Sequence, residues 1–246
     1  MRERVNILGV GIDNLNWEEA LARLVALIEG GGHHHLVTVN PEYLVIAQDN
    51  GPFREVLCQA DLALADGAGL SWAARLLGPP LKQRIPGVDL VRALARLSAQ
   101  RGYRLFLLGA APGVAEETAR VLTKESAGLS IAGYFAGSPS LADEDDIVAR
   151  VRQAAPHILL VAYGAPAQDL WFHRQRDRLG VPLAVGVGGA FDYISGRVKR
   201  APVWMQRLGL EWCYRLYQEP WRWRRMLRLP RFACLVITSR LRGARA

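Results

Sequence analysis

Short apolar runs alternate with longer amphipathic stretches along most of the chain. The runs are too short for buried helices, and glycine, proline or polar residues follow most of them, so we expect strands. Between them, apolar residues recur at helical spacing. The runs that predict strands are Val5–Val10, His35–Val39, Leu62–Ala65, Arg104–Leu108, Ile158–Ala162 and Leu183–Val187. This alternation is typical of an α/β fold with a Rossmann-like, doubly wound, mostly parallel sheet.

Several residues predict where helices begin. Asn16 is followed three residues later by Glu19, the pattern of a capping box, and predicts a helix to about Glu29. Asn40 precedes a proline that fits a first helical turn. Asp89 is expected to cap a helix that ends near Gln100. From residue 202 onward the pattern predicts short helices, divided at prolines 220 and 230.

Polar residues or glycines follow strand after strand. In open α/β sheets, ligands bind at the carboxyl ends of the strands, so side chains distant in sequence converge there. The residues at these positions are Thr38 and Asn40, Asp66 and Gly67, Gly109, Gly164, and Gly186 to Gly189. We expect the functional site at this edge.

Asp66 is the strongest candidate for a catalytic group. It ends a buried apolar strand, and Gly67, Ala68 and Gly69 leave little bulk around it. A carboxylate in a partly dry cleft can act as a general base toward a hydroxyl. The alternative is an N-cap for the helix that follows.

Neutral hydrogen-bonding residues stand at the same edge. Thr38 and Asn40 share one face of their strand and could bind a sugar or a ribose. Asn40 could instead cap the helix that begins at Pro41. Gln168 follows the turn at Gly164 and has a similar character.

The loop with Gly186, Gly188 and Gly189 would let backbone N–H groups approach an anion, such as a donor phosphate. It lacks the Lys-Ser/Thr of a Walker A loop. The 109–113 loop also lacks the full dinucleotide-binding pattern. A Rossmann-type oxidoreductase therefore remains an alternative that only the fold supports.

The net charge of +8 is unevenly distributed. Residues 197–246 contain thirteen Lys or Arg and two Asp or Glu, whereas the first 196 residues are slightly acidic. Such a segment favours phosphate from a pyrophosphate substrate, anionic lipid or nucleic acid. Arg215, Arg222 and Arg225 suit a pyrophosphate because guanidinium binds two oxygens at once. Four tryptophans here suit a membrane interface. A nucleic-acid-binding module is the alternative.

Composition narrows the class of protein. Half of the 246 residues are apolar and 22% are charged, which excludes a disordered, collagen-like or disulfide-scaffold protein. The three cysteines are far apart and predict reduced thiols in a cytoplasmic protein. We expect neither a secretory signal nor a spanning helix, and therefore a soluble or peripheral protein.

We expect no metal and no other cofactor. The acidic run from Asp143 to Asp146 follows two serines and a proline, and it predicts a helix start. The histidines from His33 to His35 would alternate across a strand and cannot share one face.

Taken in order, these segments resemble the WecG/TagA/CpsF family of bacterial glycosyltransferases over nearly the whole chain. The resemblance is carried by Thr38-x-Asn40, Ala65-Asp-Gly-x-Gly69 with Trp72, Arg84 with Gly87-x-Asp-Leu90, Gly164-x-Pro-x-Gln168, Val187-Gly-Gly-Ala-Phe-Asp192, Ser195-Gly196, Arg200-Ala-Pro202, Gly209-Leu-Glu-Trp212, Tyr214-Arg-Leu216 and Glu219-Pro220. Two departures from the family pattern bear on donor specificity and not on the proposed base: Asp169 replaces the usual Glu, and His157 replaces a frequent acidic residue.

The resemblance implies a metal-independent, inverting hexosyltransferase. It would move an N-acetylmannosamine-type sugar from a UDP-sugar to N-acetylglucosamine on undecaprenyl diphosphate, at the inner face of the bacterial membrane. It assigns the base to Asp66 and phosphate binding to the three arginines. Its polar pocket residues are Thr38, Asn40, Arg84, Gln168 and Asp192.

The resemblance also implies a division of the chain. Residues 1–196 would form the catalytic core, and residues 197–246 an appendage that closes the site and contacts the anionic membrane surface. No nucleic-acid partner is expected. The oligomeric state stays open, and a homo-oligomer is one possibility.

Overall fold

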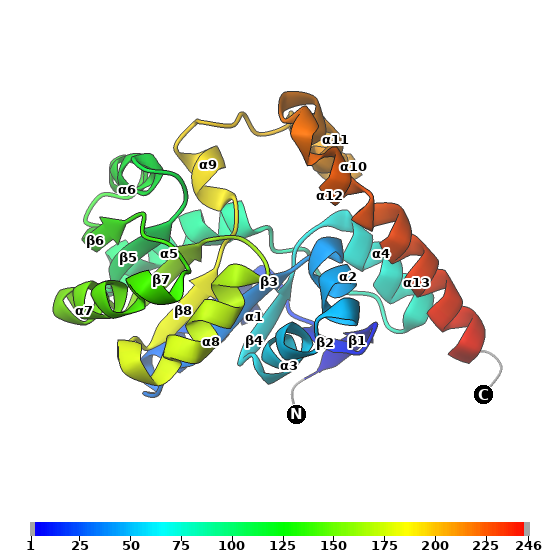
Figure 1. The fold of residues 1–246 in the computed structure, drawn as a ribbon, viewed down its shortest axis with the longest axis horizontal. Helices are drawn as coiled ribbons and strands as arrows, with labels where there is room; N and C mark the ends of the chain where they lie inside the picture. The colour runs from blue at the N-terminus through cyan, green and yellow to red at the C-terminus, as the bar shows by residue number, and fades with distance from the viewer. Residues whose placement is uncertain (1–2, 244–246) are drawn as a thin grey trace.

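The computed structural model describes residues 3–243 and has a six-stranded sheet at its centre (Figure 1). The spatial order is β4-β3-β8-β7-β5-β6, and every neighbouring pair is parallel. The prediction of a Rossmann-like α/β fold is therefore confirmed. The strands are β3 (His34–Val39), β4 (Leu62–Ala65), β5 (Arg104–Gly109), β6 (Ser130–Phe135), β7 (Ile158–Ala162) and β8 (Leu183–Gly186).

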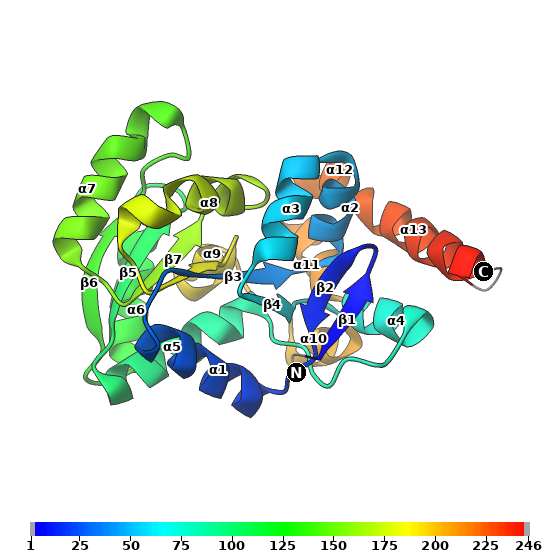
Figure 2. The ribbon, with the colours of Figure 1, turned by 90° about the horizontal axis from the view of Figure 1, so that it is seen from below.

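Helices cover both faces of the sheet because side chains along each strand alternate between two apolar clusters. Leu36 and Leu64 pack on one face, and Val37 and Ala65 on the other. The first face is covered by α1 (Trp17–Glu29), α5 (Gly87–Arg101), α6 (Val114–Glu125) and α9 (Ala190–Ile194). The second is covered by α2 (Pro41–Asp49), α3 (Gly51–Gln59), α4 (Ala68–Leu77), α7 (Glu144–Ala154) and α8 (Ala167–Leu179) (Figure 2).

The prediction of a single strand over Val5–Val10 is wrong. Residues 4–13 form a separate antiparallel hairpin of β1 (Arg4–Ile7) and β2 (Val10–Asp13). Leu8 and Gly9 have φ values of 52° and 84°, so both central residues of the turn are left-handed. Two such residues give the tight turn whose twist matches a hairpin. Leucine seldom adopts this conformation, so the turn has only one typical turn residue.

Three further differences concern element boundaries. β6 was missed because it is an edge strand whose side chains are only partly buried or exposed. Helix α5 begins at Gly87 after an N-cap at Pro86, so Asp89 lies in its first turn and is not the cap. Pro230 lies in the first turn of α13 (Arg228–Gly243) and does not divide two helices, because proline is tolerated there.

Two predicted helix starts are confirmed. Asn16 and Glu19 form both hydrogen bonds of the capping box of α1. Asn40 caps α2 through its side chain. The acidic run at 143–146 also begins a helix, since α7 follows a short 3-10 turn, η1 (Leu141–Asp143).

The last part of the chain is helical and stands over the carboxyl edge of the sheet before it runs along α2 and α4 (Figure 1). Phe232 and Val236 of α13 are buried in the same cluster as the hairpin. The boundary expected at residue 196 stays a prediction. Between residues 3 and 243, no helix combines the length and apolar character needed to span a bilayer. The remaining elements are α10 (Val203–Leu208), α11 (Glu211–Gln218), η2 (Pro220–Arg222) and α12 (Trp223–Met226).

Candidate active site

The Asp66 carboxylate lies directly after β4, where it is partly buried. Its Oδ2 accepts a hydrogen bond of 3.1 Å from the backbone N–H of Gly87, the first residue of α5. Its Oδ1 forms no hydrogen bond within residues 3–243. Asp66 does not cap α4, because the N-cap is Gly67 and no side chain caps that helix. One carboxylate oxygen is therefore fixed by the protein, and the other has no hydrogen-bond partner within residues 3–243.

The surroundings of Asp66 favour its protonated form. Burial raises its pKa to about 6, and the negative charges of Glu211 and Asp89 act in the same direction. The Gly87 N–H and the charge of Arg84 oppose them. A carboxyl group with this pKa is ionised at neutral pH and accepts a proton more readily than an exposed aspartate does.

Thr38 lies close to Asp66. A Cβ atom built on Gly87 would be 3.6 Å from Asp66 Oδ2 and 3.7 Å from Thr38 Oγ1, so both side chains converge on this glycine. The Thr38 hydroxyl donates to the Gly186 carbonyl at 2.9 Å. Asn40 uses its side-chain oxygen to cap α2, accepting from Tyr43 N at 3.1 Å. Asn40 therefore serves as a helix cap, and it lies at the same carboxyl edge of the sheet as Asp66.

Gln168 is buried and ties the glycine loop to its surroundings. Its Oε1 accepts from Gly164 N at 2.9 Å and from Gly188 N at 3.1 Å, and its Nε2 donates to Tyr43 OH at 2.7 Å. A Cβ on Gly186 would lie 2.5 Å from Gln168 Nε2. Close packing against Gln168 therefore requires glycine at 186. The N–H of Gly188 is already hydrogen-bonded to Gln168.

A group of charged residues from α9, α11 and η2 adjoins this loop. Arg215 forms ion pairs with Glu219 at 2.6 Å and Asp192 at 3.3 Å, and its guanidinium stacks on Tyr193. A Cβ on Gly189 would lie 2.8 Å from Arg215 Nη1, so the guanidinium rests directly on the loop. The structure thus brings together Arg215, Asp192 and Gly189, which the sequence proposed separately.

Arg222 shares Glu219 with Arg215, at 2.7 Å. Burial, followed by repulsion from Arg215 and Arg225, lowers the pKa of Arg222. Although burial opposes ionisation of Glu219, its two arginine partners hold its pKa below the usual value. Several positive charges thus gather around one carboxylate, and an added anion would relieve their repulsion.

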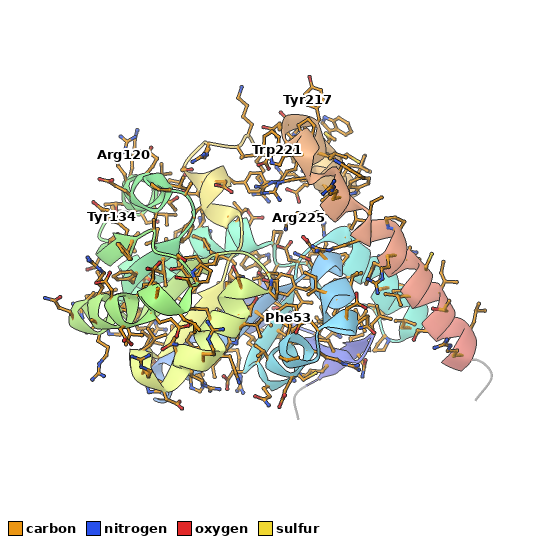
Figure 3. All side chains as sticks on the ribbon, viewed as in Figure 1. Phe53, Arg120, Tyr134, Tyr217, Trp221 and Arg225 are labelled. Atoms are coloured by element: carbon orange, nitrogen blue, oxygen red, sulfur yellow. The ribbon has the colours of Figure 1, made fainter. Side chains whose placement is uncertain are left out.

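Arg225 and Arg84 lie apart from that pair. Arg225 forms an ion pair of 2.7 Å with Glu42 in the first turn of α2, next to Asn40. Arg225 projects inward, toward the sheet, while Tyr217 lies at the outer end of the segment (Figure 3). Arg84 donates to the Gln206 carbonyl at 3.1 Å. It faces the space between α4 and α10.

Residues of the acidic run form ion pairs within the protein. Each of the last three acidic residues of the run forms an ion pair with an arginine, in the pairs Glu144–Arg174, Asp145–Arg178 and Asp146–Arg150. Within residues 3–243, no three His, Cys, Asp or Glu side chains form a group that could hold a metal. That the protein binds no metal stays a prediction.

Sequence reasoning missed the residues that position the site. Arg200 forms a bidentate ion pair with Asp89, at 2.5 and 2.8 Å, and pairs with Glu211 at 3.2 Å. These contacts join the segment before α10 to the start of α5, where Gly87 holds Asp66. Arg200 and Asp89 are both in the motifs quoted above, but their pairing over 111 residues has no local signal.

A parallel α/β sheet with a carboxylate and several arginines at its carboxyl edge has the features of a ligand site suited to phosphate groups. Comparison with known proteins defines the class of protein. The model of the glycosyl transferase WecG/TagA/CpsF family matches residues 5–246, and the chain belongs to this family. It is thereby classed as a glycosyltransferase, and the nucleic-acid-binding and oxidoreductase alternatives give way to this class.

The chain is similar to curated proteins named N-acetylglucosaminyldiphosphoundecaprenol N-acetyl-beta-D-mannosaminyltransferase. It is 39% identical to the Bacillus spizizenii protein over 82% of this chain and 78% of that one. With the Bacillus subtilis protein the identity is 37%, over 81% of this chain and 77% of the relative. The Staphylococcus aureus (strain MW2) protein is 31% identical over 92% of this chain and 88% of its own.

Proposed function

We propose that this protein transfers N-acetylmannosamine from UDP-N-acetylmannosamine to N-acetylglucosamine carried on undecaprenyl diphosphate. The names of the curated relatives supply the acceptor and the transferred sugar. The product would enter a cell-surface polysaccharide or teichoic acid. The observation that carries the proposal is the partly buried Asp66 carboxylate, held through one oxygen at the same edge of the sheet as the glycine loop on which Arg215 rests.

In the proposed mechanism, Asp66 takes the proton of the acceptor hydroxyl while that oxygen bonds to the anomeric carbon of the donor. The bond from this carbon to the UDP oxygen breaks on the opposite side, and the configuration inverts. The free Oδ1 of Asp66 suits this role, since a general base must reach the proton it removes. The carboxyl proton then passes to solvent.

The leaving diphosphate needs positive charge. Arg215 and Arg222 supply it in the proposal, next to Gly189 and Asp192. Their shared partner, Glu219, keeps both side chains in place before the substrate arrives. Fixed charges of this kind stabilise a developing anion without reorganisation, so the proposed mechanism is independent of metal.

We further propose that the protein binds the cytoplasmic face of the membrane peripherally. Large apolar side chains are exposed on α10 to α12, including Trp204, Tyr217, Trp221 and Trp223. Tyr217 lies at the outer tip of this segment in Figure 3. Arginines between them would attract anionic lipid, by about 1 kcal/mol for each residue near the surface.

The function is tested by identifying the product. The full chain is incubated with UDP-N-acetylmannosamine and a short-chain lipid diphosphate N-acetylglucosamine. We expect mass spectrometry to show one added N-acetylhexosamine, and NMR to show an anomeric configuration opposite to that of the donor. Retained configuration would contradict the mechanism, and no product with this donor would contradict the proposed sugar.

Flotation with anionic and neutral vesicles tests the membrane contact, which we expect only with anionic lipid.

A further inference from the structure

A second basic region lies between the core and α10, apart from the arginines of α11 and η2. It is a cavity of about 320 Å³ lined by Ala68, Ser71, Trp72, Arg75, Arg84 and Arg207. Residues 68, 71, 72 and 75 are spaced so that they share one face of α4. Arg207 reaches the cavity from α10, and Arg84 from the loop before α5.

The walls of this cavity are fixed by close contacts. A Cβ on Gly209, which ends α10, would lie 2.3 Å from Ala68 Cβ, so α10 is seated directly on the start of α4. Arg84 donates to the Gln206 carbonyl and joins the loop to α10 from the other side. Trp72 also contacts Phe232 of α13, with ring centroids 6.4 Å apart.

The protein neutralises the charge of the cavity only in part. Arg75 and Arg207 form no hydrogen bond or ion pair within residues 3–243, whereas Arg84 donates to a carbonyl oxygen and acts on the charge of Asp66. Arg215, Arg222 and Arg225, in contrast, all have carboxylate partners. Three guanidinium groups around one hollow, two of them without an ionic partner, suit a ligand with two or more phosphate oxygens.

The cavity begins close to the proposed base. Ala68 follows Asp66 by two residues, which span at most about 7 Å of chain. Arg84 lines the cavity and also acts electrostatically on Asp66. A sugar whose hydroxyl meets Asp66 could therefore place the phosphate on its other end in the cavity.

Exposed apolar side chains accompany the arginines of the cavity. Trp72 of α4 lines the cavity and is partly exposed. Trp204 and Leu208, close to Arg207 in the sequence of α10, are largely exposed. Apolar surface of this kind suits a hydrocarbon chain that leaves a diphosphate, whereas a UDP-sugar would bring a polar nucleoside. In the proposed function the donor diphosphate has other arginines, of which Arg215 lies beside Gly189.

We propose that the cavity between α4 and α10 binds the diphosphate of the lipid-linked acceptor, with Arg75 and Arg207 as its binding residues and Trp72 against the first part of the lipid. This assignment rests on the proposed function, because it takes the acceptor from there. It gives the two substrates two separate diphosphate sites.

The test is direct binding to the full-length protein by calorimetry. The probes are a water-soluble short-chain prenyl diphosphate N-acetylglucosamine and, separately, UDP. In the double variant Arg75→Gln/Arg207→Gln we expect Kd for the prenyl probe to rise at least tenfold, while Kd for UDP stays unchanged. Both side chains are exposed, so the fold is expected to persist. Arg152→Gln is the matched control, because it removes an exposed arginine from α7.

The proposal is overturned if the double variant binds the prenyl probe as the wild type does, or if UDP binding weakens by the same factor. It is also overturned if the wild type does not bind the probe. These results differ from failure of the proposed function. Cavity-dependent binding without sugar transfer would contradict the function alone, whereas normal transfer with an unchanged acceptor KM in the double variant would contradict the cavity site alone.

Discussion

Replacing Asp66 by Asn should abolish transfer and at the same time stabilise the protein. The amide keeps the size of the side chain and an oxygen that can accept from the Gly87 N–H, whose bond to Asp66 measures 3.1 Å. It cannot take a proton from an acceptor hydroxyl or carry a charge. Activity and stability are therefore expected to change in opposite directions.

The size of the stabilisation follows from the pKa. Burial raises the pKa of Asp66 from 3.8 to about 6, so the folded protein binds this proton more tightly than the unfolded chain does. The stabilising contribution is complete below pH 3.8 and is lost as the pH rises through 6. At pH 7.5 the ionised carboxylate therefore costs up to about 3 kcal/mol, which the Asn variant avoids. For a chain of this length that corresponds to an increase in Tm of up to roughly 10 °C.

Urea denaturation at several pH values measures this effect. The free-energy difference between the Asn variant and the wild type should be largest above pH 7 and fall to about half at pH 5. Asp177→Asn on α8 is the control, because Asp177 is exposed and has no ion pair within residues 3–243. An Asp66→Asn protein that is no more stable at pH 7.5, or whose advantage is the same at pH 5, would refute the reasoning.

The same pKa predicts the pH dependence of the reaction. A base must be ionised, so kcat/KM is expected to be constant above pH 7 and to fall about tenfold for each unit below pH 6. The profile is measured with the donor below its KM. A profile that stays flat down to pH 5 would remove Asp66 as the base.

Two further substitutions test the remaining contacts. Arg222→Ala should lower turnover by about 100-fold, because positive charge at the leaving group is lost. It should lower Tm only slightly, because Glu219 keeps Arg215 as a partner. Parallel losses of activity and Tm would instead give Arg222 a structural role. Gly186→Ala should cost about 1–3 kcal/mol in urea denaturation, because its Cβ would lie 2.5 Å from Gln168 Nε2. Gly51→Ala has no atom within 4 Å and should not destabilise the fold, so equal effects of the two alanines would contradict this explanation.

Local patterns predicted the parts of the fold that local forces determine. The strands Leu62–Ala65 and Ile158–Ala162 match their apolar runs, because both faces of these strands are buried. The capping box of α1 is contained within four residues. The hairpin at residues 4–13 was missed because its turn has one glycine and an apolar residue in a rare conformation.

The candidate site was predictable only in outline. The rule for carboxyl ends of strands located Asp66 and the glycine loop, since it depends on topology and not on distant contacts. It could not find Gly87, whose N–H reaches Asp66 from 21 residues away. Nor could it pair Arg225 with Glu42, across 183 residues. Contacts of this kind depend on how helices pack in three dimensions.

The most direct test of the account is a UDP-release assay with UDP-N-acetylmannosamine and EDTA, with and without a short-chain lipid diphosphate N-acetylglucosamine. The account predicts UDP release that requires the acceptor, persists in EDTA and is lost in Asp66→Asn. Release that requires an added divalent metal, that proceeds equally without the acceptor, or that survives the loss of the Asp66 carboxylate would contradict it.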